Sequence, residues 1–366
     1  MTRSQSALVV GGGVFGLSIA RELARRGRRV TLVDRQSPGH AVPAGPSTAE
    51  SRILRCSYGT RQWYSAMAHA SAQQWRDLEK EAGRELLVPC GVIGFASRAP
   101  SEPADADGEL ASLAALSELG IPVEKLTPQS VARRFPGVAD VDLDFAVYEP
   151  ESGVLRAREA VGALAESAQR YGCRMLRGAA RPDGAGVRID DAETYTADVV
   201  VWTVGAALPD LFPGLTSARA AHQVSYYLDS TAMPCAPGGP AWIDRRRGLY
   251  GVGALSPRGV KVVPDVETPV GAPAPAARPE LPATARSYLR GRFPALAAAP
   301  VATAETCAYA AMEDEEFLVG RHPAHEHVWL VGGDSGHGFK NAPTWGKYVC
   351  DVMDGTTTVH SRWRLR

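Results

Sequence analysis

A glycine-rich segment at residues 11–16 (GGGVFG) limits the fold of this chain more than any other feature. It follows a short apolar run at residues 7–10, typical of a strand buried in a parallel sheet, and opens a helical pattern that ends at Gly27. A second apolar run, residues 29–33, ends at Asp34. This order predicts a dinucleotide-binding βαβ unit: a strand, a G-x-G-x-x-G turn, a helix, a second strand and an acidic residue.

The residue types in this unit suit a dinucleotide. The first glycines permit a tight turn and the close approach of a pyrophosphate to the helix N-terminus, while Gly16 allows the helix to pack closely on the strand. Asp34 can accept hydrogen bonds from a ribose diol, and its charge disfavours the 2′-phosphate of NADP. The alternative is a glycine turn without a ligand, and the motif alone does not separate FAD from NAD. The predicted cofactor contacts in this unit are Gly11, Gly13, Val14, Phe15, Gly16, Asp34 and Arg35.

Later segments predict that the nucleotide domain is built from separated pieces. Residues 197–205 form an apolar strand that runs into a turn at Gly205, and residues 328–338 repeat the strand and glycine-loop pattern. Before both of them, residues 157–171 have the pattern of a crossover helix. We therefore expect an α/β fold (α+β overall) in which a second domain is threaded through the first. The predicted pieces are residues 1–90, 150–215 and 300–366 for the nucleotide domain, and 91–149 and 216–299 for the second domain.

Other segments have simpler patterns. Helices are expected from about residue 63 to Gly83, near 110–119 and over 128–135, and strands over 86–97, 121–126, 222–228 and 249–264. Residues 36–50, 98–109 and 264–282, which are rich in small, polar or proline residues, are expected to form loops.

Composition excludes several classes of function. Forty basic residues balance forty acidic ones, so charge does not favour nucleic acid or an anionic membrane as a partner. No apolar run approaches the roughly 18–20 residues of a transmembrane helix, and three glycines interrupt the apolar N-terminal stretch, unlike a signal peptide. Six scattered cysteines suggest reduced thiols in a cytoplasmic protein. Thirty-five of the forty cations are arginines, so the few lysines stand out.

Five segments occur in the order typical of one family of flavoproteins. They are residues 51–59 (SRILRCSYG), 149–155 (EPESGVL), 259–261 (GVK), 307–309 (CAY) and 336–340 (GHGFK). With the first glycine motif, they resemble the monomeric sarcosine oxidase and N-methyltryptophan oxidase family of D-amino-acid-oxidase-like proteins. The resemblance implies a Rossmann-like FAD-binding domain, an interleaved antiparallel-sheet substrate domain, and a monomeric amine or amino-acid oxidase. Such an enzyme passes hydride from a C–N bond to flavin and then reduces O₂ to hydrogen peroxide.

The resemblance also implies roles for single residues. Cys307 matches a cysteine that carries the flavin through a thioether; the alternative is a buried structural thiol. Lys261 matches a lysine held over the flavin N5 edge, where a fixed cation stabilises the anion formed as O₂ is reduced. The alternative is an exposed lysine in a salt bridge.

Arg55 and Lys340 match a pair that grips the substrate carboxylate, one through a planar fork and the other as a point charge. Arg52 matches a basic residue near the flavin ring. Tyr250 and Tyr309 match aromatic residues of the substrate pocket, although core filling is the alternative. The further cofactor contacts implied are Arg52, Gly205, Cys307, Gly336, His337, Gly338 and Lys340, with His337 acting mainly through its backbone.

The sequence also departs from the family. Thr48 and Asp265 stand where sarcosine oxidase or close relatives have histidines, so the pocket is not expected to be that of sarcosine oxidase. The histidines at 322, 325 and 327 have a spacing that suits no common metal site, and we expect no metal.

Two further functions stay open. One is a biosynthetic oxidase that desaturates a cyclic imino acid or a carrier-linked or peptide-linked amine. The other is an NAD-linked dehydrogenase, which fits the first motif but explains neither Cys307 nor the C-terminal glycine loop. A non-catalytic flavin-binding protein is a more distant alternative.

Overall fold

The computed structural model describes residues 5–36, 47, 49–97, 108–190, 192, 194–236, 238–267 and 280–365. Thr48 and most of the predicted loops at 36–50, 98–109 and 264–282 lie outside these residues. In the described part of the chain, no helix combines the length and the apolar character needed to cross a membrane.

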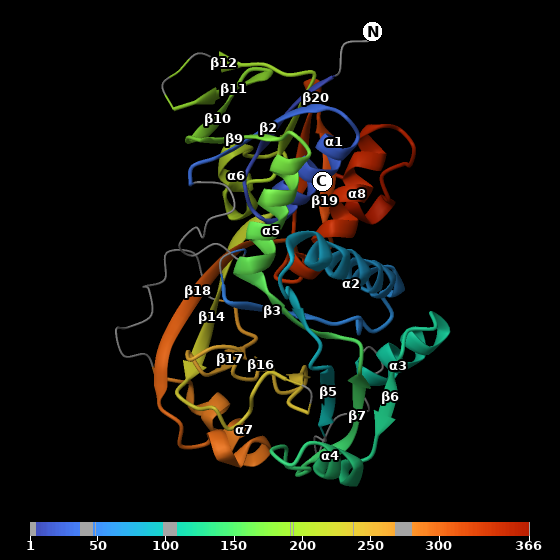
Figure 1. Cartoon of the computed structure of the whole chain (residues 1–366), viewed down its shortest axis with the longest axis vertical. Coiled ribbons are helices and arrows are strands. Elements are labelled where there is room, and N and C mark those ends of the chain that lie inside the picture. The colour runs from blue at the N-terminus through green and yellow to red at the C-terminus, as the bar shows by residue number, and fades with distance from the viewer. Residues whose placement is uncertain are drawn as a thin grey trace.

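A six-stranded sheet forms the upper half of the molecule in Figure 1. Its strands, in spatial order, are β19 (Leu318–His322), β20 (His325–Gly332), β13 (Val199–Trp202), β1 (Ser6–Val10), β2 (Arg29–Asp34) and β9 (Arg174–Arg177). All neighbours are parallel except the β19–β20 pair. The chain thus returns to this sheet from three distant segments, as the separated glycine turns predict.

Both faces of this sheet are covered, which explains its continuous apolar strands. In β1, Ala7 and Val9 pack into the cluster formed by the helices, whereas Leu8 and Val10 pack into the cluster on the opposite face. The helices of the first face are α1 (Val14–Arg25), α2 (Gln62–Ala82), α5 (Ala157–Arg170) and α8 (Ala342–Met353). The opposite face carries α6 (Leu208–Leu211) and a small sheet of β10 (Ala180–Asp183), β11 (Gly186–Ile189) and β12 (Thr194–Tyr195).

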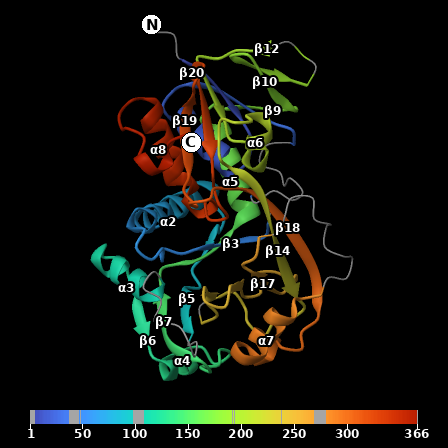
Figure 2. The same ribbon diagram turned by 180° about the vertical axis from the view of Figure 1, so that it is seen from behind.

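An eight-stranded sheet forms the lower half of the molecule (Figure 2). Its spatial order is β18 (Val301–Ala311), β14 (Arg219–Leu228), β17 (Val260–Pro264), β16 (Leu249–Val252), β15 (Ala241–Asp244), β5 (Val92–Ser97), β7 (Leu143–Glu149) and β6 (Glu124–Leu126). Its pairs are antiparallel except β15–β5. Around it lie α3 (Glu109–Glu118), α4 (Pro128–Arg134) and α7 (Ala283–Arg292).

A short third sheet lies where the two halves meet (Figure 1). It consists of β3 (Ser51–Leu54), β8 (Gly153–Arg156) and β4 (Leu87–Val88). The long pair β14 and β18 also runs from one half to the other (Figures 1 and 2). Segments that belong to different parts of the sequence are therefore brought to one junction.

The predicted α/β class is confirmed, with two local corrections. The strand predicted over 86–97 is in fact two strands, β4 and β5, in different sheets, because the chain turns at Pro89–Gly91, where Gly91 has φ +77°. The strand predicted over 121–126 begins only at Glu124. The division into two domains stays a prediction; β18, within its 300–366 piece, pairs with β14 of its second domain.

The start of α1 lies unusually close to the strand ends. A Cβ atom at Gly16 would lie 1.8 Å from the carbonyl oxygen of Gly11 and 2.5 Å from Oγ1 of Thr203. That hydroxyl in turn donates to the carbonyl oxygens of Val10 and Gly11 at 3.0 and 3.1 Å. Gly11 itself has φ +109°, which disfavours a side chain. The turn and the helix therefore depend on these two glycines.

Replacing Gly16 by Ala should lower the free energy of unfolding by about 3 kcal/mol or more, because its neighbours are backbone atoms that cannot yield cheaply. Thermal and urea denaturation measure the loss. The control is Gly291→Ala in α7, where an added Cβ meets no atom within 4 Å; this change should be neutral or stabilising by up to about 1 kcal/mol. Equal stability of both variants would contradict the close packing.

A polar cluster joins three helices of the upper half. Glu81 of α2 accepts hydrogen bonds from Arg21 of α1 at 2.8 Å and from Ser167 and Arg170 of α5 at 2.6 and 3.0 Å. Partial burial alone would raise the pKa of Glu81, but the bonds from Ser167, Arg21 and Arg170 outweigh it and lower the pKa to about 2. The ionised carboxylate therefore stabilises the folded chain.

Glu81→Gln should cost about 1 kcal/mol of unfolding free energy at pH 7. Because the folded-state pKa lies below the ordinary 4.5, the stabilisation is complete above that value and is lost as the pH falls toward about 2. The difference in unfolding free energy between the parent and Glu81→Gln, measured by urea denaturation, should therefore shrink as the pH falls over this range. Asp77→Asn, a change at an exposed residue of the same helix, should have little effect at any pH; a pH-independent Glu81 effect would refute the linkage.

Candidate active site

Two neighbouring cavities lie at the junction of the halves. The first, of about 450 Å³, is lined by the carboxyl ends of β1, β2, β13 and β20, which is where α/β sheets bind ligands. The second, of about 290 Å³, lies between the third sheet, the eight-stranded sheet and the loop after β20. The loop after β20 contributes Asp334 to the first cavity and Ser335 to the second, and β18 contributes Ala308 and Tyr309 respectively. The two cavities therefore follow one another along the same segments.

Most of the predicted nucleotide contacts line the first cavity. They are Gly11, Gly13, Val14, Phe15, Asp34, Arg35 and Gly205. Gly16 does not line it and acts instead through its packing on Gly11. Asp34 accepts hydrogen bonds from the backbone N–H groups of Gly12 at 2.6 Å and Gln36 at 2.8 Å, so its carboxylate holds the turn while it faces the cavity.

The first cavity fits a dinucleotide. The N-terminus of α1 borders it, and a helix N-terminus favours a phosphate through its free N–H groups and its dipole. The glycines at 11 and 16 bring the backbone close to this space, and the carboxylate of Asp34 lies where a ribose diol can bind.

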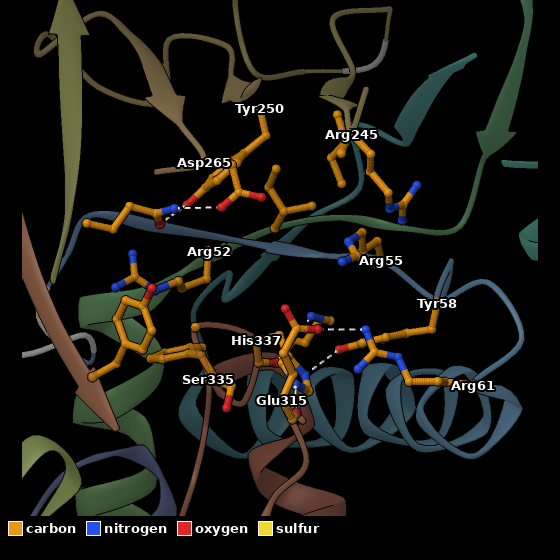
Figure 3. A pocket seen from close by; sticks show the side chains of 17 residues that line it. Arg52, Arg55, Tyr58, Arg61, Arg245, Tyr250, Asp265, Glu315, Ser335 and His337 are labelled. Atoms are coloured by element: carbon orange, nitrogen blue, oxygen red, sulfur yellow. Dashed lines mark hydrogen bonds and ion pairs between the residues drawn. The ribbon is translucent and has the colours of Figure 1, made fainter. Parts of the chain in front are cut away.

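Cys307 and Arg52 meet beside the second cavity. Cys307, on β18, is 8% exposed, and its Sγ lies 3.4 Å from Nη2 of Arg52 on β3. Arg52 lines the cavity (Figure 3), whereas Cys307 lies behind it, between Ala308 of the first cavity and Arg52 of the second. This contact fixes the position of the thiol beside Arg52.

Lys261 is buried near the guanidinium group of Arg52. Only 4% of it is exposed, and its Nζ donates to the carbonyl oxygen of Ser51 at 3.2 Å. Burial, and then the nearby positive charge of Arg52, lower the pKa of Lys261 to about 7. The alternative of an exposed lysine in a salt bridge is therefore wrong: Lys261 is an interior residue held against the backbone of β3.

Arg55 and Lys340 meet over one aromatic ring in the second cavity; Figure 3 shows Arg55 and this ring, Tyr58. The Cζ atom of Arg55 lies 4.7 Å from the centre of the Tyr58 ring, and Nζ of Lys340 lies 4.8 Å from it. Their hydrogen bonds within the described chain go to the backbone oxygens of Ser57 and His337, and neither side chain has a carboxylate partner there. Burial, followed by mutual repulsion with Arg55, holds the pKa of Lys340 well below its ordinary value. The two basic side chains thus lie together in the cavity over one ring.

The imidazole of His337 holds the glycine loop in place. Its Nε2 donates to the carbonyl oxygen of Glu315 at 2.8 Å, so its Nδ1 accepts from the hydroxyl of Tyr58 at 3.1 Å. Burial, and then the charge of Lys340, hold the pKa of His337 well below its ordinary value. The neutral ring thus fixes Tyr58 below the two cations. His337, Gly336 and Lys340 line the second cavity, and Gly338 packs behind them against Asp334 and Phe15.

A chain of hydrogen bonds closes the opposite end of the second cavity (Figure 3). The hydroxyl of Tyr250 donates to Oε1 of Gln223 at 2.6 Å, and Nε2 of Gln223 donates to Oδ1 of Asp265 at 2.8 Å. All three side chains line the cavity. Tyr309 lines it too, and its hydroxyl donates to Glu267 at 3.3 Å. Both tyrosines therefore face the cavity, as the pocket role requires.

Three functional neighbours were not identified from the sequence. Tyr58 lies within the 51–59 segment, which the sequence analysis singled out, but no role was predicted for its side chain. Gln223 and Arg245 carry no motif. Gln223 lies on β14 and Arg245 directly after β15, and the eight-stranded sheet, in which β17 and β16 separate these strands, brings both residues to the cavity. Arg245 is held there by an ion pair with Glu109 and by the carbonyl of Ser57.

Comparison with known proteins agrees with this geometry. The chain is 27% identical to monomeric sarcosine oxidase from Bacillus sp. (strain B-0618), with 98% of this chain and 95% of the relative covered. It is 28% identical to N-methyl-L-tryptophan oxidase from Yersinia pestis (strain Pestoides F), with 93% and 92% covered. The fold is similar to that of L-proline dehydrogenase from P. horikoshii, with a TM-score of 0.82, 19% identity, and 98% and 95% covered.

The family described as DAO, FAD dependent oxidoreductase, matches residues 6–352. This range includes the glycine turn, both cavities and every residue placed above. The dinucleotide for this family is FAD, so the alternative of an NAD-linked dehydrogenase is not supported. The chain is an enzyme that belongs to the family of FAD-dependent oxidoreductases that includes the amine and amino-acid oxidases.

Proposed function

We propose that this enzyme oxidises the C–N bond of a small primary or secondary amino acid with O₂ as the acceptor. The observation that carries the proposal is the pair formed by the buried Lys340 and the partly buried Arg55, two cations without a carboxylate partner among the described residues. Buried charges are normally paired, so an anionic group of the substrate is the expected partner. A carboxylate bound there would be held over Tyr58, which the neutral His337 keeps in place.

The charge balance around this pair suits one carboxylate. Arg55, Lys340 and Arg245 bring three positive charges to the same end of the cavity. Glu109 pairs with Arg245, and the buried Glu149 accepts hydrogen bonds from the backbone N–H groups of residues 56 and 57 nearby. One positive charge is left for a ligand, as expected for a monocarboxylate.

Bound FAD would supply the redox chemistry, in which the substrate carbon gives up hydride, an imine forms, and O₂ is reduced to hydrogen peroxide. The protein groups hold the substrate and the cofactor for it. The first cavity would hold the nucleotide part, and Arg52, Cys307 and Lys261 would border the flavin ring. Lys261 would place a compact cation where O₂ acquires negative charge.

We further propose that Cys307 carries the flavin through a thioether. Its support is the position on β18 between the two cavities and the contact with Arg52. We also propose a monomeric cytoplasmic enzyme, because the relatives include proteins named monomeric sarcosine oxidase and the six scattered cysteines of the sequence suit reduced thiols.

A cyclic imino acid is a second candidate substrate. It keeps the carboxylate for Arg55 and Lys340, and its imine stays within the ring. The presence of Asp265, where sarcosine oxidase has a histidine, favours a substrate other than sarcosine. A screen of N-methyl, cyclic and primary amino acids for anaerobic bleaching of the flavin and for peroxide release separates these substrates. If no amine bleaches the flavin, the proposed function is wrong.

Cys307→Ser should leave the flavin bound but no longer covalently attached. Acid precipitation of the parent protein should give a yellow pellet, and that of the variant a white pellet with a yellow supernatant. Cys173→Ala, which removes a buried thiol remote from both cavities, serves as the control and should keep the yellow pellet. A yellow pellet from Cys307→Ser would exclude this attachment site.

Lys261→Met should slow the reaction of the reduced flavin with O₂ by about 10²-fold or more, because the buried cation that stabilises the developing anion is removed. Stopped-flow mixing of photoreduced protein with O₂ measures this step without any substrate. Lys125→Met, at an exposed lysine, should react at the parent rate. An unchanged oxidation rate in Lys261→Met, or equal slowing of anaerobic reduction by the amine, would contradict the assigned role.

A further inference from the structure

The hydrogen-bond chain from Tyr250 through Gln223 to Asp265 has a fixed direction. A carboxylate only accepts hydrogen bonds, so the Gln223 group that lies 2.8 Å from Oδ1 of Asp265 must be the amide N–H₂. The amide oxygen then faces Tyr250 and accepts its proton at 2.6 Å. Reversing the amide would set its oxygen against the carboxylate. Asp265 therefore sets the orientation of the whole chain.

This direction decides what Tyr250 can offer a ligand. Burial raises the pKa of Tyr250 above its ordinary value, so the phenol keeps its single proton. That proton is engaged with Gln223. Toward the cavity that it lines, the hydroxyl of Tyr250 can therefore only accept a hydrogen bond.

The two ends of the second cavity thus differ in polarity. Arg55 and Lys340 donate at one end, while Tyr250 and Asp265 accept at the other, with the charge of Arg52 near Tyr250. Figure 3 shows Arg55 apart from Tyr250 and Asp265. Three neighbouring segments build the accepting end: Gln223 lies on β14, Tyr250 on β16, and Asp265 directly after β17. β17 pairs with both β14 and β16, so the sheet fixes the spacing of the chain.

We propose that Asp265 is a specificity-determining positioning residue that makes Tyr250 a hydrogen-bond acceptor for an N–H group next to the substrate carboxylate. The proposal rests on the proposed function, because it takes the carboxylate to be bound by Arg55 and Lys340. It gives a physical reason for the substrate class proposed above, because it requires amino acids whose nitrogen keeps an N–H group in the neutral, reactive form. These are primary amines, secondary amines and cyclic imino acids, whereas N,N-dialkyl amino acids are excluded.

The test uses two planar ligands of nearly the same shape that carry no oxidisable amine. Pyrrole-2-carboxylate presents an N–H group beside its carboxylate, and furan-2-carboxylate presents an oxygen there. Binding to the flavin-loaded protein is measured by isothermal titration calorimetry and by the change in flavin absorption, neither of which depends on turnover. The parent protein should bind pyrrole-2-carboxylate at least about tenfold more tightly, a difference that corresponds to about 1.4 kcal/mol.

Asp265→Asn should reduce this preference to less than about threefold, because an amide at 265 can donate as well as accept and no longer orients Gln223. The affinity for furan-2-carboxylate should stay the same or increase. Asp265→Glu keeps the carboxylate and should retain the preference. Asp229→Asn, a change at an exposed residue just beyond the end of β14, is the matched control and should behave as the parent.

Each other outcome overturns the inference in a recognisable way. Equal binding of both ligands to the parent protein refutes the N–H selection but leaves the carboxylate site intact. If Asp265→Asn lowers the affinity for both ligands equally, Asp265 has a merely structural role. If neither ligand binds, and Arg55→Met leaves the anaerobic bleaching of the flavin by amines unchanged, Arg55 and Lys340 do not bind a carboxylate. The proposed function is then wrong together with the inference. Oxidation of N,N-dimethylglycine as fast as that of its monomethyl analogue also refutes the exclusion of tertiary amines.

Discussion

The close contact between helix α1 and the ends of β1 and β13 is the constraint on which the rest of the structure depends. Gly16 has no Cβ to separate the helix from Gly11, and the hydroxyl of Thr203 ties both strand ends to the same turn. Asp34, at the end of the next strand, holds the turn from its other side. Three parallel strands therefore end around one helix N-terminus, and the first cavity lies there because no side chain fills the space.

The second cavity depends on a different constraint, the burial of several charges in one small volume. Arg55 and Lys340 repel each other, and Lys340 is removed from water, which is unfavourable without a ligand. The protein limits this cost locally. The ring of Tyr58 faces both cations, and the buried Glu149 braces the backbone between Arg55 and Tyr58 through the N–H groups of residues 56 and 57. The site is thus held in a form that a carboxylate would complete.

The sequence predicts the parts of this protein that depend on local chemistry. The turn at residues 11–16 and the helix that ends at Gly83 follow from glycine conformation and periodicity, and both are confirmed. The long strand β18 was not predicted, although it carries Cys307, because its partly buried residues show no clear alternation. The contacts of Gln223 and Arg245 depend on strand pairing across long stretches of chain, which no local pattern encodes. The roles assigned to single site residues stay predictions, since geometry places them but does not test them.

The distribution of lysine and arginine links composition to the site. Among the five lysines, Lys261 and Lys340 are 4% and 5% exposed, whereas Lys80, Lys125 and Lys347 lie on the surface. An arginine keeps its charge almost regardless of its surroundings, but a buried ammonium group can lose its proton at moderate pH, as the pKa of about 7 for Lys261 shows. An ammonium group is also compact enough to lie beside Arg52 or Arg55 without the planar fork of a second guanidinium. A chain that uses arginine for most of its cations therefore has a physical reason to keep lysine at these two interior positions.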